Sequence, residues 1–210
     1  MIKITNTDIF GIHTAIKSMR NPLNSWKKSD TSNGFIGDND MSLAMKLITA
    51  GTEHRKFLRM IHVQATVEAP LYWWKEYDTY KVGTVANSCS TMHTIHKALF
   101  TSSMFSSDHL ESEAGKKLFE STIDTLNELR VKYLETKDKS YWYEIIQLLP
   151  SSFNQLRTID VNYEVLINIY NQRKNHKLDE WHTFCSWIES LPNMNHFLNG
   201  VTEDGQTEGR

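Results

Sequence analysis

Cysteine is scarce in this chain of 210 residues, which contains only Cys89 and Cys185. Secreted domains that depend on disulfides carry many more cysteines, so we expect a reduced, cytoplasmic protein. Neither cysteine has a partner at a metal-ligand spacing, and a structural zinc site is therefore not expected. The first ten residues, MIKITNTDIF, also lack the basic and then apolar pattern of a signal peptide.

Long hydrophobic runs and an excess of charge of one sign are absent as well. No run of about 18 apolar residues occurs, so we expect no membrane span. The 23 Lys and Arg nearly balance the 25 Asp and Glu, and a net charge of −2 does not indicate a nucleic-acid partner. Hydrophobic residues make up 40% of the chain, which is ordinary for a globular domain with its own core.

The sequence has none of the short motifs that mark common phosphate and nucleophile sites. A P-loop, a dinucleotide-binding glycine fingerprint and a nucleophile elbow are all missing. His93 and His96 are three residues apart, as on one helix face, but no further ligands stand at a recognised spacing, so no metal site is predicted. Cys89 has no adjacent basic residue to stabilise a thiolate, which favours a small neutral residue in a tight turn over a nucleophile.

The periodicity of apolar residues favours helix over strand and predicts a mixed α/β (α+β) fold. We expect one domain over 1–197 and a disordered polar tail over 198–210. Asp8 and Asp40 are expected to cap the first two helices, and Pro70 is expected to be the first residue of the third. Strands are predicted at 1–5, 58–69 and 153–162. Helices are predicted at 8–19, 41–50, 70–77, 112–136, 140–149, 163–173 and 178–191.

Residues 20–40, RNPLNSWKKSDTSNGFIGDND, are rich in residues that favour turns and are predicted to form a loop. The loop is long for a compact domain. Long ordered loops often reach a ligand or a neighbouring subunit, but simple surface mobility explains the same composition equally well.

Residues 73–93, WWKEYDTYKVGTVANSCSTMH, join an aromatic, helix-like run to a run of small polar residues. From Lys81 to Ser90 this run combines one cation, one glycine and several short hydroxyl or amide side chains. Backbone N–H groups of a glycine-containing turn can bind an anion, and short side chains let a phosphate approach. The run therefore favours an anion site, and an ordinary turn between helices is the alternative.

The segment GTEHRKFLRMIHVQATVEAPLYWWKEYDTYKVGTVANSCSTM resembles the signature region of flavin-dependent thymidylate synthases. Those enzymes place His-x-Thr before a strand, often Ala-Pro after it, and then a helix, the motif RHRxxS and a Ser-x-Arg-Tyr. His54 stands where the family has its flavin-contacting histidine, and Lys56 replaces the threonine. Ala69 and Pro70 fall at the joint between strand and helix without a gap.

The RHRxxS motif falls on residues 79–84, with several substitutions. Lys81 replaces the last arginine and Thr84 the serine, which are mild changes, whereas Thr79 replaces the first arginine. Further along, Asn87 aligns with an acidic residue of the family and Cys89 with its substrate-side serine. The pair Thr91-Met92 stands in place of Arg-Tyr.

The C-terminal half carries a second part of the resemblance. The run DVNYEVLINIYNQRKNH is similar to the family's Asn-x-Arg…Leu…Phe…Arg helix. Asn162, Leu166, Tyr170 and Arg173 match that pattern, whereas Glu164 replaces an arginine that binds the nucleotide phosphate. A carboxylate at that place is expected to repel a phosphate.

The resemblance implies a helix-rich fold with a small central sheet, in an enzyme that methylates dUMP with methylenetetrahydrofolate and NADPH. It also implies that FAD and dUMP bind at the interfaces of a homotetramer. It assigns no catalytic residue. The cofactor-binding residues that it implies are His54, Tyr80, Lys81 and Asn87. The nucleotide-binding residues that it implies are Lys81, Thr84, Ser88, Cys89, Ser90 and Arg173.

Three functional hypotheses follow from the substitutions. The first is a nucleotide-binding protein with a remodelled site, which binds or sequesters a nucleotide or nucleotide signal and is not a normal dUMP methylase. The second is an active FAD-dependent methyltransferase that acts on a dUMP-like nucleotide. The third is a non-catalytic structural or partner-binding relic of the fold. Loss of the phosphate arginines favours the first hypothesis and predicts weak or absent FAD. The divergent pattern also resembles that of phage and prophage proteins.

Overall fold

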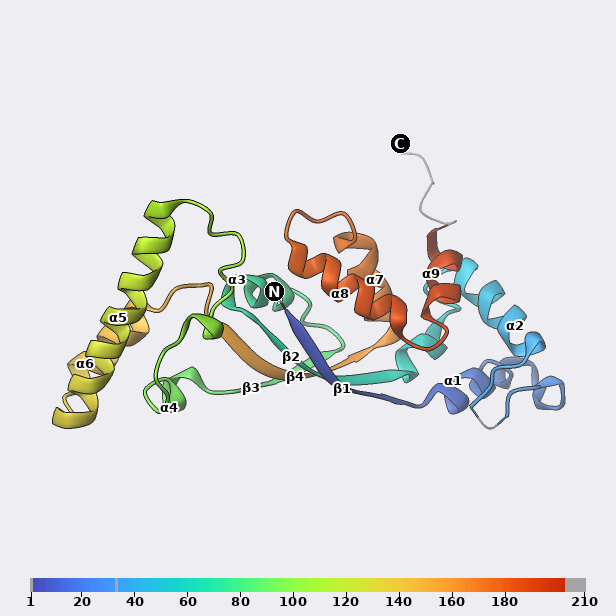
Figure 1. Cartoon of the computed structure of the whole chain (residues 1–210). Helices are drawn as coiled ribbons and strands as arrows, with labels where there is room; N and C mark the ends of the chain where they lie inside the picture. The colour runs from blue at the N-terminus through green and yellow to red at the C-terminus, as the bar shows by residue number, and fades with distance from the viewer. Residues whose placement is uncertain (1, 33, 203–210) are drawn as a thin grey trace. The chain divides into compact units, whose positions relative to one another are not determined.

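The computed structural model describes residues 2–32 and 34–202, and it confirms a helix-rich fold with a small central sheet (Figure 1). The strands are β1 (Lys3–Phe10), β2 (His62–Pro70), β3 (Thr84–Ser88) and β4 (Asn154–Asn162), and they form one sheet in the order β1-β2-β4-β3. The helices are α1 (Ile12–Ser18), α2 (Asp38–Thr49), α3 (Leu71–Tyr77), α4 (Thr91–Thr94), α5 (Glu113–Thr136), α6 (Lys139–Leu148), α7 (Tyr163–Arg173), α8 (Asp179–Ser190) and α9 (Met194–Thr202). Short 3-10 turns lie at η1 (Asn21–Leu23), η2 (Trp26–Lys28), η3 (Lys56–Met60) and η4 (Ser102–Met104).

The chain divides into two compact units, and each strand of the sheet contributes residues to both. Unit 1 comprises Met1–Lys3, Val67–Thr79 and Asn87–Thr158, and unit 2 comprises Ile4–Thr66, Tyr80–Ala86 and Ile159–Arg210. The assignment of 1–197 to one domain stays a prediction.

Unit 1 is organised around the helical pair α5 and α6. The two helices lie side by side (Figure 1), and their apolar faces meet a cluster of buried aromatic and aliphatic side chains. Ser112 caps α5, because its hydroxyl accepts a hydrogen bond from the Gly115 N–H at 3.1 Å. The helices predicted at 112–136 and 140–149 are confirmed to within about a residue. The buried cluster is Ile95, Phe100, Phe105, Leu126, Leu129, Ile145 and Phe153.

The helix α3 shows how the predicted aromatic run folds. Trp73, Trp74 and Tyr77 are all buried, as their helical spacing suggests, and the Trp73 and Tyr77 rings stack with centroids 5.3 Å apart. Pro70 is the last residue of β2 and caps α3 rather than forming its first turn. A missing N–H is tolerated in either position.

Unit 2 has its core between α7, α8 and η3. Tyr163, Leu166, Ile167 and Ile169 of α7 are buried, as are Trp181 and Phe184 of α8. Asn162 caps α7, since its side-chain carbonyl accepts a hydrogen bond from the Val165 N–H at 3.0 Å. The predicted strand at 153–162 and the helices at 163–173 and 178–191 are confirmed.

The predicted cap at Asp8 is wrong. The first strand continues through Asp8 to Phe10, and α1 begins only after Gly11. Gly11 has a φ of +85°, and a Cβ there would lie 2.6 Å from the carbonyl oxygen of Met60. The change of direction from strand to helix therefore depends on glycine and on a contact that lies far away in the sequence.

The predicted cap at Asp40 is also wrong, because α2 begins at Asp38 and Asp40 points into the protein. The capping group is Asp30, whose carboxylate accepts hydrogen bonds from the backbone N–H groups of Asn39 at 2.8 Å and Asp40 at 3.0 Å. Gly37 permits this approach, since a Cβ there would lie 2.2 Å from the Asp30 carboxyl carbon. The segment 20–40, predicted as a loop, contains the turns η1 and η2.

The structure also corrects the alternative reading of the polar run and the expectation for the C-terminus. Residues Thr84–Ser88 form the edge strand β3 instead of a simple turn. The helix α9 reaches Thr202, so 198–202 are helical although a disordered tail was predicted there; 203–210 lie outside the described residues. Among the described residues, no helix is long and apolar enough to cross a membrane.

Candidate nucleotide site

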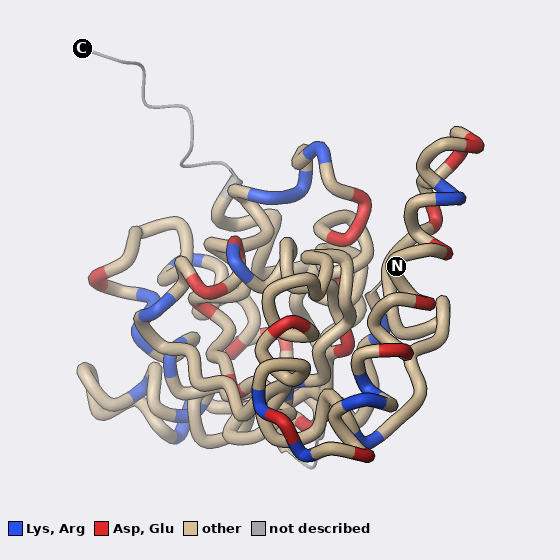
Figure 2. Tube along the Cα trace, turned by 90° about the vertical axis from the view of Figure 1, so that its left-hand side faces the viewer, with Lys and Arg blue, Asp and Glu red and all other residues tan. Residues whose placement is uncertain are grey.

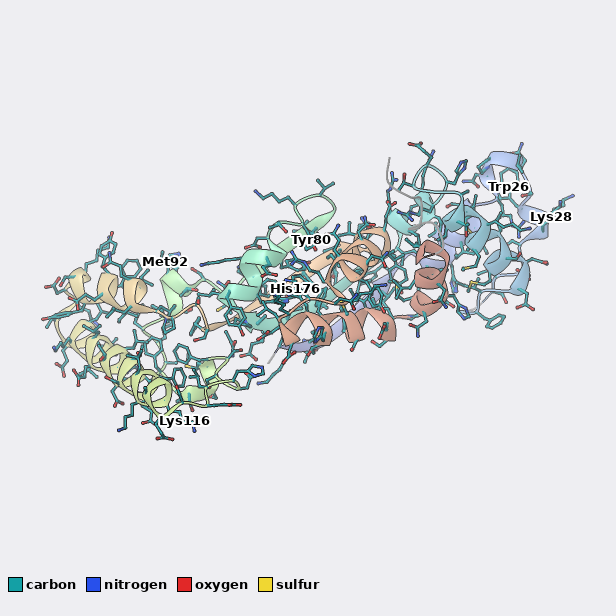
Figure 3. All side chains as sticks on the ribbon, turned by 90° about the horizontal axis from the view of Figure 1, so that it is seen from above. Trp26, Lys28, Tyr80, Met92, Lys116 and His176 are labelled. Carbon is teal, nitrogen blue, oxygen red and sulfur yellow. The ribbon has the colours of Figure 1, made fainter. Side chains whose placement is uncertain are left out.

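Tyr80 and Arg173 form the centre of the candidate site in unit 2. The Arg173 Nε–H donates to the Tyr80 hydroxyl at 2.8 Å, and that hydroxyl donates to the Gln172 side-chain oxygen at 3.0 Å. The Arg173 guanidinium carbon lies 4.8 Å from the centroid of the Trp181 ring. Tyr80 and His176, both labelled in Figure 3, each place a ring 6.2 Å from the Trp181 ring. The structure thus holds an arginine beside two aromatic rings at a predicted nucleotide-binding position.

The next residues of the run pack against the beginning of α7. Gly83 has a φ of +76°, and a Cβ there would lie 3.0 Å from both the Asn162 amide nitrogen and a Val165 methyl carbon. The Thr84 hydroxyl donates a hydrogen bond to the Tyr80 carbonyl. Because its proton is used by the backbone, Thr84 offers a ligand only its oxygen lone pairs. Lys81 lies in the same turn and is exposed.

The remaining predicted residues of the run belong to unit 1. Asn87 and Ser88 are exposed on β3, and Cys89 follows as an exposed free thiol. The Ser90 hydroxyl accepts a hydrogen bond from the His93 N–H at 3.4 Å and so caps α4. Ser90 therefore has a structural function in addition to any contact with a ligand.

Gln155 links the residues around Cys89 in a way that the sequence did not indicate. Its side-chain nitrogen donates to the Cys89 carbonyl at 3.0 Å and to the Thr91 hydroxyl at 3.3 Å. Cys89 and Thr91 line a pocket of about 310 Å³ in unit 1, together with apolar side chains such as Ile95 and Phe153. The pocket is of the size that small ligands occupy.

His54 lies in a separate part of unit 2, where it lines a cleft of about 1030 Å³. Its own wall of the cleft comes from the turn before η3 and from η3 itself. Another wall comes from residues 18–28, which include Trp26 and Lys28 (Figure 3), and Leu43 and Leu47 of α2 complete the lining. Basic side chains predominate among the charged groups of the lining, which are Arg20, Lys27, Lys28, Glu53 and Lys56, besides His54.

Glu164 does not present a bare carboxylate to a ligand, contrary to the expected repulsion of a phosphate. Its side chain is only 10% exposed and accepts hydrogen bonds from the Nε–H groups of Arg55, at 3.2 Å, and Arg59. The hydrogen bond and the charge of Glu164 together raise the pKa of Arg59. The negative charge of Glu164 is thus balanced within unit 2 by two arginines.

The histidine pair considered for metal binding does not lie on one regular helix. The helix α4 ends at Thr94, so His96 lies beyond it, and the His96 ring packs 5.0 Å from the Tyr133 ring. Within the described residues, no group of three or more His, Cys, Asp or Glu is arranged to hold a metal ion. Figure 2 shows basic and acidic residues interspersed along the trace.

Sequence reasoning missed the residues that complete these contacts. Gln172 and Trp181 complete the surroundings of Tyr80 and Arg173, and Arg55 and Arg59 pair with Glu164. Arg55 follows His54 directly in the chain, and Gln172 precedes Arg173. Proximity to a predicted residue was therefore a signal for two of them, whereas nothing local indicates Trp181 or Arg59.

Comparison with solved structures identifies the class of fold. A thymidylate synthase X from Helicobacter pylori, solved with FAD and dUMP, matches with a TM-score of 0.68 at 15% identity, over 96% of this chain and 99% of that chain. A second structure of the Helicobacter pylori flavin-dependent enzyme, complexed with FAD and dUMP, matches with a TM-score of 0.68 at 16% identity, over 93% and 97%. The UMP/dUMP methylase PolB from Streptomyces cacaoi, bound with 5-Br dUMP, matches with a TM-score of 0.61 at 11% identity, over 97% and 93%.

These matches show that the chain has the fold of flavin-dependent thymidylate synthases over nearly its whole length. No protein-family model and no curated protein matches the chain. At identities of 11–16%, the likeness establishes the fold, and the function has to be argued from the residues of the site.

Proposed function

We propose that this protein binds a nucleotide through a remodelled site and is not an ordinary dUMP methylase. The observation that carries the proposal is the ordered Tyr80–Arg173 contact beside the exposed Lys81 in unit 2. The turn before β3 contributes the aromatic ring of Tyr80 and the ammonium of Lys81, and the end of α7 contributes the guanidinium of Arg173. Such a set suits a phosphate and a base. The three solved structures that share the fold all hold a uridine nucleotide or its analogue, which supports this ligand class.

Calorimetry with a panel of mononucleotides, including dUMP, and of cyclic nucleotides tests the proposal. We expect at least one of them to bind the wild-type protein. A charged hydrogen bond contributes about 1.5–3 kcal/mol, so Lys81→Ala should weaken binding about ten- to hundredfold. Lys132→Ala removes a similar exposed lysine from α5 in unit 1 and should leave the affinity unchanged. If no nucleotide binds, or if Lys81→Ala binds as tightly as the wild type, the proposal is wrong.

The loss of ordinary methylation follows from the substitutions in the signature region. Thr79 and Thr91 stand where the resemblance places arginines, and a neutral hydroxyl does not replace a guanidinium at a phosphate. We therefore expect no turnover of dUMP with methylenetetrahydrofolate and NADPH under conditions in which an active synthase turns over. The contributions of Asn87, Ser88, Cys89 and Ser90 stay predictions and are tested by alanine substitutions against the same nucleotide panel.

An active flavin-dependent enzyme is the second candidate, and the cleft beside His54 is the observation that favours it. The residues present fit an anionic cofactor in part. His54 and Lys56 on one wall and Trp26 on the other would contact it, and the volume of about 1030 Å³ is large enough for a dinucleotide. Bound FAD would supply the redox chemistry of a methylation.

We nevertheless propose weak or absent FAD, because Thr79 and Tyr80 replace two contacts that the resemblance assigns to the flavin. The phenol of Tyr80 is, in addition, hydrogen-bonded to Gln172 and Arg173. The absorption spectrum of the purified protein decides between the candidates, and mass spectrometry identifies whatever co-purifies. A yellow preparation with one FAD per chain would support the enzyme.

We also propose that the chain forms a homo-oligomer, and specifically a tetramer. The support is the resemblance, whose sites are built between subunits, and the exposed apolar side chains of the helical pair in unit 1. Leu118 on α5 is 70% exposed, and Leu148 on α6 is 50% exposed. Association would remove such side chains from water.

A further inference from the structure

We propose that Glu164 is a positioning residue that fixes the His54 wall of the cleft through Arg55 and Arg59. The resemblance places a phosphate-binding arginine at this position, and the substitution by glutamate reverses the charge. The structure indicates what the carboxylate does instead, since it binds two arginines of the segment that carries His54. Because the cleft beside His54 is the cofactor site of the second candidate function, the inference rests on that candidate.

In the segment from Glu53 to Met60, Leu58 is fully buried and the other side chains separate into two sets. One set lines the cleft, and the other set, Arg55 and Arg59, is absent from the lining and binds Glu164 at the start of α7. Each lining residue of this segment is therefore within two positions of an arginine that is attached to α7. The cleft-lining residues of this segment are Glu53, His54, Lys56, Phe57 and Met60.

Arg59 also holds the turn itself. Its Nη2 group donates to the Thr52 carbonyl at 3.1 Å, while its Nε group donates to Glu164. Within the turn, the His54 and Arg55 N–H groups donate to the Gly51 carbonyl at 3.0 and 3.2 Å. One guanidinium thus connects α7, the turn before His54 and the 3-10 turn η3 after it.

The Glu164 carboxylate is well placed to orient both Arg55 and Arg59. It lies in the first turn of α7, where a negative charge is favoured by the helix dipole. Both Glu164 and Arg55 are nearly inaccessible to water, with side chains about 10% exposed, so their pairing is little weakened by solvent. The backbone continues the link, because the Tyr163 N–H donates to the Ile61 carbonyl at 3.0 Å. Loss of Glu164 would leave two arginines without this anchor, one of them buried.

The test uses the full chain without any ligand, so that it does not depend on whether a nucleotide or FAD binds. The His54 ring signal is identified in a 1H–13C spectrum by its disappearance in His54→Gln. Glu164→Gln keeps the shape of the side chain but removes its charge. We expect this variant to shift the His54 signal and to accelerate hydrogen exchange of the amides from His54 to Ile61 at least tenfold. Glu164→Asp keeps the charge, so its His54 signal and its exchange rates should lie between those of Glu164→Gln and those of the wild type.

The control variant is Glu189→Gln. Glu189 lies on α8 and accepts a hydrogen bond from the hydroxyl of Tyr170, which is on α7 like Glu164 but near the other end of that helix. It should lower the global stability without shifting the His54 signal. If Glu164→Gln does not fold, Arg59→Gln gives the answer, since Arg59 is half exposed and its removal leaves the Arg55–Glu164 pair in place.

An unchanged His54 signal and unchanged exchange in the folded Glu164 or Arg59 variant would overturn the inference. The inference would also be overturned if Glu189→Gln shifted the His54 signal as far as Glu164→Gln does. If the expected shifts occur and neither a mononucleotide nor FAD binds the wild type, the positioning by Glu164 stands and both candidate functions fail.

Discussion

Gly83 shows how one residue without a side chain determines where the polar run lies. Its φ of +76° is strained for any other amino acid, and its α-carbon faces Asn162 and Val165 of the α7 start. The glycine was singled out in the sequence as part of an anion-binding turn. The structure gives it a second function, which is the close packing of residues 80–86 on α7.

Gly83→Ala is therefore expected to lose stability for two reasons. The left-handed conformation costs about 1–2 kcal/mol for an L-residue, and a methyl group forced against a packed side chain costs about 1–3 kcal/mol more. Gly51 has a φ of +100° but open space around its Cβ position, so Gly51→Ala isolates the conformational cost. Urea denaturation of both variants should show the larger loss for Gly83→Ala. Equal losses would mean that the packing against α7 contributes nothing.

At the scale of elements, the segment from Arg20 to Asp40 and the helix α2 stabilise each other. Asp40 is fully buried, and its carboxylate accepts hydrogen bonds from the Ser29 hydroxyl at 2.6 Å, the Thr31 N–H at 3.1 Å and the Arg20 Nε–H at 2.9 Å. Burial acts to raise the pKa of Asp40, but hydrogen bonds from Ser29, Thr31 and Arg20 outweigh it and lower the pKa below 3.8. The segment that forms one wall of the cleft is therefore ordered by a buried ion pair.

The lowered pKa of Asp40 predicts the sign of a pH effect. A carboxyl group with a lower pKa in the folded state stabilises the fold above about pH 3.8, and this contribution is lost as the pH falls through its folded pKa. Asp40→Asn leaves Arg20 without its charged partner and should cost about 3–5 kcal/mol at pH 7. In urea denaturation between pH 7 and pH 3, the difference from the wild type should shrink toward low pH. The exposed Asp38 of the same helix turn provides the control, because Asp38→Asn should change stability little at any pH.

At the scale of the whole molecule, the proposed tetramer is the expectation that a single measurement decides. Light scattering at micromolar concentration should give a mass near four times 24.4 kDa, which is about 98 kDa. A dilution series should show the mass falling only at low concentration, since association shifts with protein concentration. A mass of 24.4 kDa throughout the series would exclude the oligomer.

The sequence by itself determined the class of fold and most of the regular elements. The helices α5 to α8 and the strand β4 were predicted because their apolar residues repeat with a local period, which the chain carries whatever surrounds it. The burial of Trp73, Trp74 and Tyr77 followed from the same spacing. His54 and the polar run were identified as candidate site residues from short motifs, which involve only residues that are close together in the sequence.

Only the tertiary structure decided which of those residues contact each other and which groups end the helices. The cap of α2 is Asp30, several residues before the helix, and the partner of Tyr80 is Arg173, 93 positions away. Glu164 appeared in the sequence as a charge that would repel a phosphate, because its partners Arg55 and Arg59 lie 109 and 105 positions away. Contacts between distant segments leave no periodic signal, because they depend on how the elements pack and not on the order of neighbouring residues. Whether a charged group is available to a ligand is therefore a property of the folded chain.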